Sequence, residues 1–165
     1  MSFYATLKSL IEEKIINDSQ LNAESAFCEI VADYLQDSSL ITEFTHSPYF
    51  KEVLGNKNLK IDGFSINENE TVLSLYIASY NNKNEENKLN LKDVETIFKQ
   101  LYRVLNYVIR PNENELPKAN VLSSLNAEYH KGIKYKIVKV DFYLFTNSTT
   151  VNKKEVVVSK IVSKT

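Results

Sequence analysis

The chain has 165 residues, 43% of them hydrophobic, which suits one globular domain with a substantial core. Its 20 basic and 21 acidic residues give a formal net charge of -1, which excludes a general electrostatic attraction to nucleic acid or to an acidic membrane. With three glycines, the chain lacks the material for a glycine-rich phosphate-binding loop.

Two amphipathic helices are predicted at the start of the chain. The first has apolar residues at helical spacing from Phe3 to Ile15, and the second covers about 23–35 with Asn22 as its expected cap. The only cysteine, Cys28, falls among apolar residues of the second helix, which is typical of a small core side chain in a reducing compartment. A cytoplasmic location is therefore expected. Charged residues within 1–16 exclude a secretory signal, and no uncharged stretch approaches the roughly 18 residues of a membrane span, so no membrane partner is expected.

A hairpin is predicted in the middle of the chain. Residues 59–66 and 72–80 have the composition of strands, and the polar segment 67–70 between them suits a turn. The preceding segment, 42–58, is irregular and is expected to be a connection with one short element at most.

The second half of the chain predicts further helices and strands. Apolar residues from Val94 to Val108 recur at helical spacing before Pro111 ends the pattern. A second helix is predicted over 119–130, a long strand over 135–146, and a last strand over 153–162. The residues of the long strand expected to share one face are Val138, Val140, Phe142 and Leu144.

This order of elements predicts an α/β or α+β fold, with a mixed β-sheet flanked by helices. Residues 1–165 are expected to form a single globular domain. Because the sequence stops just after a strand, this domain is interpreted as the N-terminal part of a longer protein.

Two acidic residues are candidates for chemistry, Glu24 on the apolar side of the second helix and Asp62 beside Gly63 in a strand. Together they could bind Mg²⁺ or Mn²⁺, because these hard cations prefer carboxylate and water oxygens. Structural alternatives stand beside this hypothesis. Glu24 suits a first-turn acid stabilised by the helix dipole, and Asp62 suits a strand or bulge residue that Gly63 makes tolerable.

A metal-dependent nuclease needs two or three carboxylates and a lysine, and the sequence does not supply the full set near Asp62. The strand positions where a further acid and a lysine are expected are Ser79 and Asn81. The nearby triplet 86–88, with Glu86 and Lys88, has the composition of a solvated loop. Asp141 is a further candidate acid.

Lys134, Lys136 and Lys139 form a basic cluster that could contact a nucleic-acid backbone. Lysines that flank a strand more often protect its solvent-facing positions, so both interpretations stay open.

Several motifs together resemble the N-terminal domain of the abortive infection phage resistance family, in order and spacing from Glu24 to about Asn147. They are Glu24–Phe27, Val31–Leu35, Lys60–Phe64, Leu73–Ile77 and Val140–Asn147. The resemblance implies a domain at the front of a longer bacterial antiviral protein, with a core similar to restriction-endonuclease-like folds. In such a core Glu24 would be the helix acid and Asp62 the first strand acid, while Ser79 and Asn81 depart from the pattern of an active enzyme.

Three hypotheses follow. The first is a nuclease-like but catalytically incomplete domain of a phage-defence protein, which serves recognition or assembly and binds nucleic acid or a phage-derived component. The second is an active nuclease in which Mg²⁺ or Mn²⁺ is held by Glu24, Asp62 and a further acid such as Glu86 or Asp141. The third is a protein interaction module that forms a homo-oligomer through exposed apolar surface.

Overall fold

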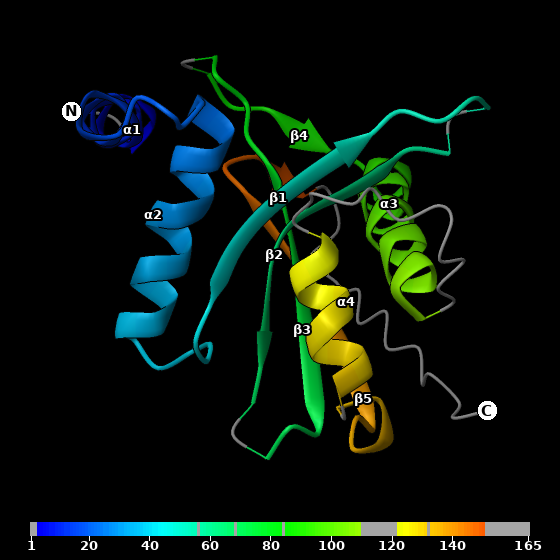
Figure 1. The fold of residues 1–165 in the computed structure, drawn as a ribbon. Helices are drawn as coiled ribbons and strands as arrows, with labels where there is room; N and C mark the ends of the chain where they lie inside the picture. The colour runs from blue at the N-terminus through cyan, green and yellow to red at the C-terminus, as the bar shows by residue number, and fades with distance from the viewer. Residues whose placement is uncertain are drawn as a thin grey trace.

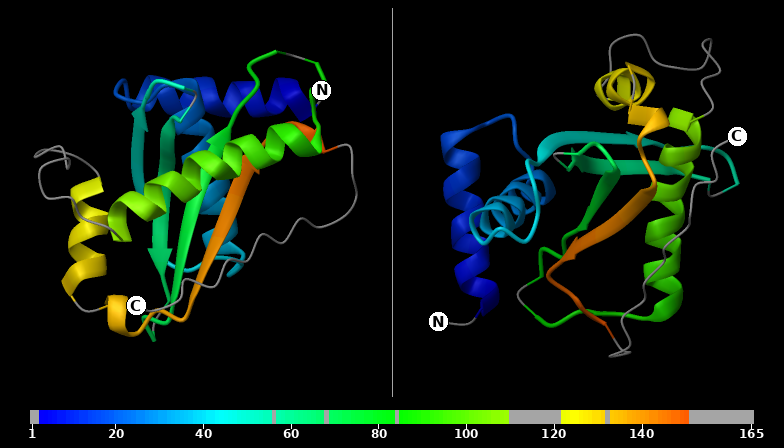
Figure 2. Two further views of the ribbon diagram at one scale, coloured as in Figure 1. Left: turned by 90° about the vertical axis from the view of Figure 1, so that its right-hand side faces the viewer. Right: turned by 90° about the horizontal axis from the view of Figure 1, so that it is seen from below.

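The computed structural model describes residues 3–55, 57–67, 69–83, 85–109, 122–131 and 133–150. It has three layers, in which two helices cover one face of a mixed sheet and a long helix crosses the other (Figures 1 and 2). The α/β class predicted from the sequence is confirmed. The helices are α1 (Phe3–Asn17), α2 (Ala23–Asp37), α3 (Leu91–Ile109) and α4 (Leu122–Lys131), with a short 3₁₀ helix η1 (Ile133–Tyr135).

The main sheet has the strand order β1-β2-β3-β5. Its strands are β1 (Thr45–Lys51), β2 (Leu59–Ile66), β3 (Val72–Ser79) and β5 (Lys139–Thr146). The first three pair antiparallel in chain order, and β5 runs parallel to β3 after the crossover that contains α3. Two short strands, β4 (Lys88–Leu89) and β6 (Thr149–Thr150), pair parallel beside this sheet.

Helix α3 covers one face of the sheet because its apolar residues repeat at helical spacing. Leu101, Val104 and Val108 of α3 are buried in a core that includes Leu73 and Ile77 of β3. Helix α4 adds Leu125 to the same core. The helix and the face of β3 predicted from the sequence are thus confirmed.

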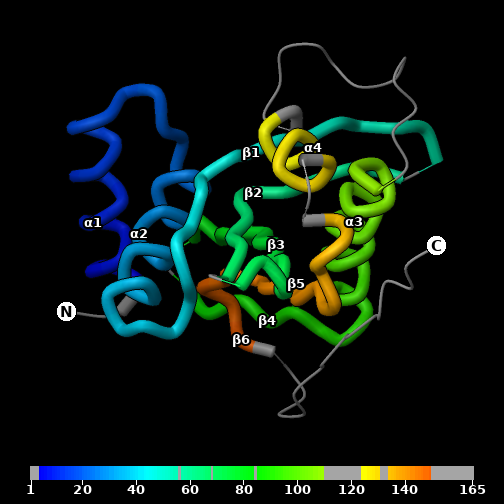
Figure 3. Tube along the Cα trace, turned by 60° about the horizontal axis from the view of Figure 1, so that its bottom comes forward, coloured from blue at the N-terminus to red at the C-terminus, as the bar shows by residue number. Residues whose placement is uncertain are grey.

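Helices α1 and α2 cover the opposite face, as the tube in Figure 3 shows. The side chain of Asn22 caps α2 by accepting a hydrogen bond from the Ser25 backbone N–H at 2.8 Å. Phe27 and Cys28 of α2 then pack against Tyr76 of β3. This second core is the one that borders the candidate site.

The structure refines two predictions. The irregular segment 42–58 contains β1, in which the pairing with β2 shifts register between His46 and Tyr49. Strand β5 begins at Lys139, so Val138 precedes it and is 61% exposed rather than aligned with the buried face. The strand predicted over 153–162 lies outside the described residues. Of the helices in the described part of the chain, none is both long and apolar enough to cross a membrane.

Candidate functional site

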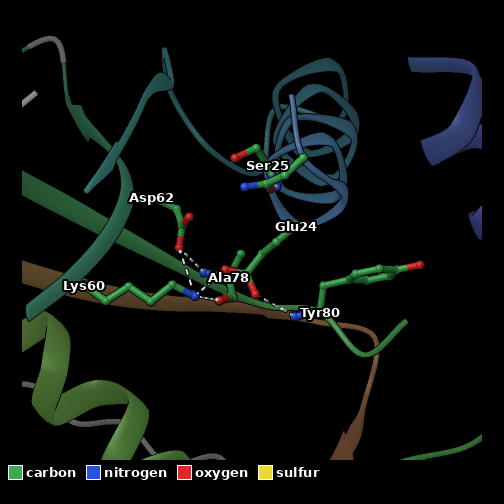
Figure 4. Close-up of polar contacts among 7 residues, drawn as sticks. Glu24, Ser25, Lys60, Asp62, Ala78 and Tyr80 are labelled. Atoms are coloured by element: carbon green, nitrogen blue, oxygen red, sulfur yellow. Dashed lines mark hydrogen bonds and ion pairs between the residues drawn. The ribbon is translucent and has the colours of Figure 1, made fainter. Parts of the chain in front are cut away.

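Strands β2 and β3 part at Asp62, and two side chains of β2 bridge the gap. Backbone pairing runs from Ile66–Leu73 to Gly63–Tyr76, a register that would place Ala78 opposite Ile61. The Ala78 N–H instead donates to Asp62 Oδ2 at 2.7 Å, and the Ala78 carbonyl accepts from Lys60 Nζ at 2.6 Å (Figure 4). Side chains of β2 therefore satisfy both backbone groups of Ala78 that face this strand.

An irregularity in β2 accompanies this gap. Ile61 and Phe64 both pack into the core under α3, although residues three apart in a regular strand face opposite sides. The break falls at Asp62 and Gly63. Gly63 is required there because a Cβ atom at this position would overlap the ring of Phe44 and lie 2.7 Å from the Thr45 carbonyl oxygen.

Helix α2 brings Glu24 to the same point. Glu24 Oε1 accepts from Lys60 Nζ at 2.5 Å, and Glu24 Oε2 accepts from the Tyr80 backbone N–H at 3.4 Å. The Glu24 side chain is 35% exposed, so its carboxylate is in contact with solvent as well as with the Lys60 ammonium. The structure thus brings together Glu24 and Asp62, the two acids singled out in the sequence.

Lys60 is the residue that sequence reasoning missed as part of the site. Its Nζ lies 3.8 Å from Asp62 Oδ2 in addition to its contacts with Glu24 and Ala78. The spacing of two residues between Lys60 and Asp62 was the available signal, because such residues share one face of a strand. We refer to Glu24, Lys60, Asp62 and the Ala78 backbone as the charged centre.

Strand β3 contributes no ionisable side chain to this centre. The residues on the α2 side are Ala78 of β3 and Tyr80, which follows the strand. Both pack in the core there, whereas the sequence pattern placed the missing acid and lysine at Ser79 and Asn81. The Asn81 backbone is hydrogen bonded to the Asn147 side chain through both its N–H and its carbonyl, at 2.8 and 2.7 Å.

Burial dominates the electrostatics of Asp62, which is only 4% exposed. The loss of hydration raises the pKa of its carboxyl group, while Lys60 and the Ala78 N–H act in the opposite direction. Burial also raises the pKa of the neighbouring Cys28 thiol, with Asp62 and Glu29 adding to the effect. This environment favours the protonated thiol and is typical of a structural core cysteine.

The three candidate lysines lie at the other end of the sheet. Lys136 pairs with Glu70 at 2.7 Å, Lys139 pairs with Asp141 at 3.1 Å, and Lys134 lies over the ring of Tyr135. They do not join Glu24 and Asp62 in one site.

The additional acids considered from the sequence lie outside the charged centre as well. Asp141 precedes Phe145, the partner of Ala78, by four residues, roughly 13 Å along the strand. Glu86 accepts a hydrogen bond from the Thr149 hydroxyl. Within the described residues, no group of three or more His, Cys, Asp or Glu side chains is arranged to hold a metal ion.

The donor set of the charged centre nevertheless fits a hard cation. Two carboxylates and the Ala78 carbonyl present oxygen atoms to the position of the Lys60 ammonium, which is itself a cation. Mg²⁺ in proteins is typically held by one or two carboxylates and completes its shell with water and substrate phosphate. Glu24, Asp62 and the Ala78 carbonyl are thus the groups that could hold Mg²⁺ or Mn²⁺.

The fold and the centre define an α/β domain with a helix acid, a strand acid and a lysine on one face of its sheet. The chain belongs to the family described as abortive infection phage resistance protein N-terminal domain, whose model matches residues 27–164. This membership supports a role in phage defence. Lys60 and Asp62 lie within the matched range, and Glu24 lies just before it. Searches of curated proteins and of solved structures find no match.

Proposed function

We propose that this domain is a divalent-metal-dependent nuclease module of a phage-defence protein. The observation that carries the proposal is the meeting of Glu24, Asp62 and Lys60 at the gap between β2 and β3, because it provides two acids and the lysine that the sequence pattern lacked. The family resemblance led us to expect a restriction-endonuclease-like core, and a mixed sheet flanked by helices with both acids on one face is compatible with such a core.

In this proposal each side chain has a defined role. Glu24 and Asp62 hold the cation, and the Ala78 N–H fixes the Asp62 carboxylate in place. A bound divalent cation would polarise a phosphoryl oxygen and lower the pKa of a coordinated water. The Lys60 ammonium, on a flexible chain at the partly exposed edge of the centre, can contact a phosphate oxygen.

The test is cleavage of labelled single- and double-stranded DNA and RNA in Mn²⁺ by the wild-type chain and two variants. Asp62→Asn removes a proposed ligand, and Asp141→Asn removes the same charge outside the centre. The proposal expects cleavage by wild type and Asp141→Asn and none by Asp62→Asn. If the wild type cleaves none of the four substrates, the nuclease function is refuted for this chain.

A second candidate is recognition or assembly without cleavage, on nucleic acid or a phage-derived component, with self-association as one form of assembly. It is favoured by Ala78 of β3 and by Tyr80 just after the strand, which lie next to the centre and carry no charge. Salt-dependent oligonucleotide binding without cleavage, or a stable dimer in light scattering, is the expected result. Under either candidate, a cytoplasmic location stays a prediction from the sequence.

A further inference from the structure

We propose that Lys60 acts as a built-in cation that occupies the charged centre until a metal ion and a phosphate displace it together. This inference concerns the regulation of the site and rests on the proposed nuclease function. Its basis is that the two oxygens closest to the Lys60 ammonium, Glu24 Oε1 at 2.5 Å and Ala78 O at 2.6 Å, belong to the groups that would bind the metal.

The ammonium and a metal ion therefore compete for the same oxygens. With Lys60 in place, one positive charge already serves two carboxylates, and a divalent cation would meet repulsion instead of an open set of ligands. The free domain is thus expected to bind divalent cations weakly although its acids are correctly placed.

Lys60 has a path out of the centre. Its side chain is 19% exposed, and its four-carbon stem allows the ammonium to move while the backbone of β2 stays fixed. A nucleic-acid phosphate would give the displaced ammonium a new anionic partner. Metal and phosphate binding are consequently coupled, each favouring the other.

The experiment is calorimetric titration of Mn²⁺ into the wild-type chain, Lys60→Met and Lys136→Met. Both substitutions change the formal net charge from -1 to -2, but Lys136 pairs with Glu70 away from the centre. Lys60→Met is expected to bind Mn²⁺ at least about tenfold tighter than wild type, within the range of typical coupling between ligands. Lys136→Met is expected to match wild type.

Equal or weaker Mn²⁺ binding by Lys60→Met would overturn the inference. Thermal melting monitors folding of each variant, and Lys60→Gln replaces Lys60→Met if the latter does not fold. Lysine side-chain NMR of the wild type gives an independent readout, since the Lys60 signal must shift when Mg²⁺ and an oligonucleotide are added together; an unchanged signal overturns the inference.

The two proposals fail in different ways. Tighter Mn²⁺ binding by Lys60→Met without any cleavage by wild type removes the nuclease function and leaves Lys60 as the resident cation. Cleavage by wild type with no change in Mn²⁺ affinity on substitution of Lys60 removes the resident cation and leaves the nuclease.

Discussion

The hydrogen bond between Asp62 and the Ala78 N–H gives a quantitative prediction for stability. Asp62→Ala leaves this buried N–H without its partner, a loss of about 1–3 kcal/mol in the free energy of unfolding. Asp62→Asn keeps an amide oxygen that can accept the same hydrogen bond. It also removes a carboxylate that is 4% exposed and whose pKa burial has raised. Asp62→Asn is therefore expected to equal or exceed wild type in stability at pH 7.

Urea unfolding followed by far-ultraviolet circular dichroism measures both variants, since the chain has no tryptophan to serve as a fluorescent probe. The urea concentration at the midpoint of unfolding is expected to be equal to or higher than that of wild type for Asp62→Asn. For Asp62→Ala it is expected to be lower than that of wild type. If Asp62→Asn is as destabilised as Asp62→Ala, the charge of Asp62 beside Lys60 holds the strands, and the reasoning from the hydrogen bond is wrong.

Three further predictions follow. Because burial raises the pKa of Asp62, the folded state binds its proton more tightly than the unfolded state does. The wild type should therefore lose stability relative to Asp62→Asn as the pH rises from about 4 to 7. A difference in urea midpoint that stays constant over this pH range would contradict this. Gly63→Ala should lower the free energy of unfolding by about 1–3 kcal/mol, because the added Cβ atom overlaps the ring of Phe44; a melting temperature equal to that of wild type would contradict this. Asn67→Ala should lower the free energy of unfolding by about 1–3 kcal/mol, because it removes the side-chain oxygen that accepts hydrogen bonds from two backbone N–H groups of the β2–β3 turn. A urea midpoint equal to that of wild type would contradict this.

Strong periodicity in the sequence was enough to predict most of the fold. Helix α3 and strand β3 carry regular apolar spacing, and a polar turn joins β3 to β2; all three were predicted close to their observed bounds. Strand β1 was not identified as a strand, because its sequence contains Pro48 and its register shifts between His46 and Tyr49. A strand with such an irregularity does not show the simple alternation of apolar and polar residues by which strands are recognised in a sequence.

The charged centre was predictable in part. Glu24 was singled out because it lies at the centre of an apolar helix face, where its carboxylate points toward the core side, and in the structure it pairs with Lys60. Lys60 itself was missed because the sequence pattern places the lysine of such a site on β3 and not on β2. The face that β3 turns toward Glu24 depends on pairing with its neighbours on both sides, and this information is not local in the sequence.

The packing of Phe44 connects the fold to the charged centre. The Gln36 side chain at the end of α2 accepts a hydrogen bond from the Phe44 N–H at 2.9 Å, and the Phe44 ring contacts Tyr76 edge-on at 5.1 Å. The ring can approach β2 this closely only because residue 63 is glycine. Since β2 becomes irregular at this point, its side chains rather than its backbone reach Ala78. The residues that could hold a cation therefore also make hydrogen bonds to backbone groups of β3 that the backbone of β2 does not make. A loss of activity in any of their variants consequently identifies a functional role only when the variant is as stable as wild type.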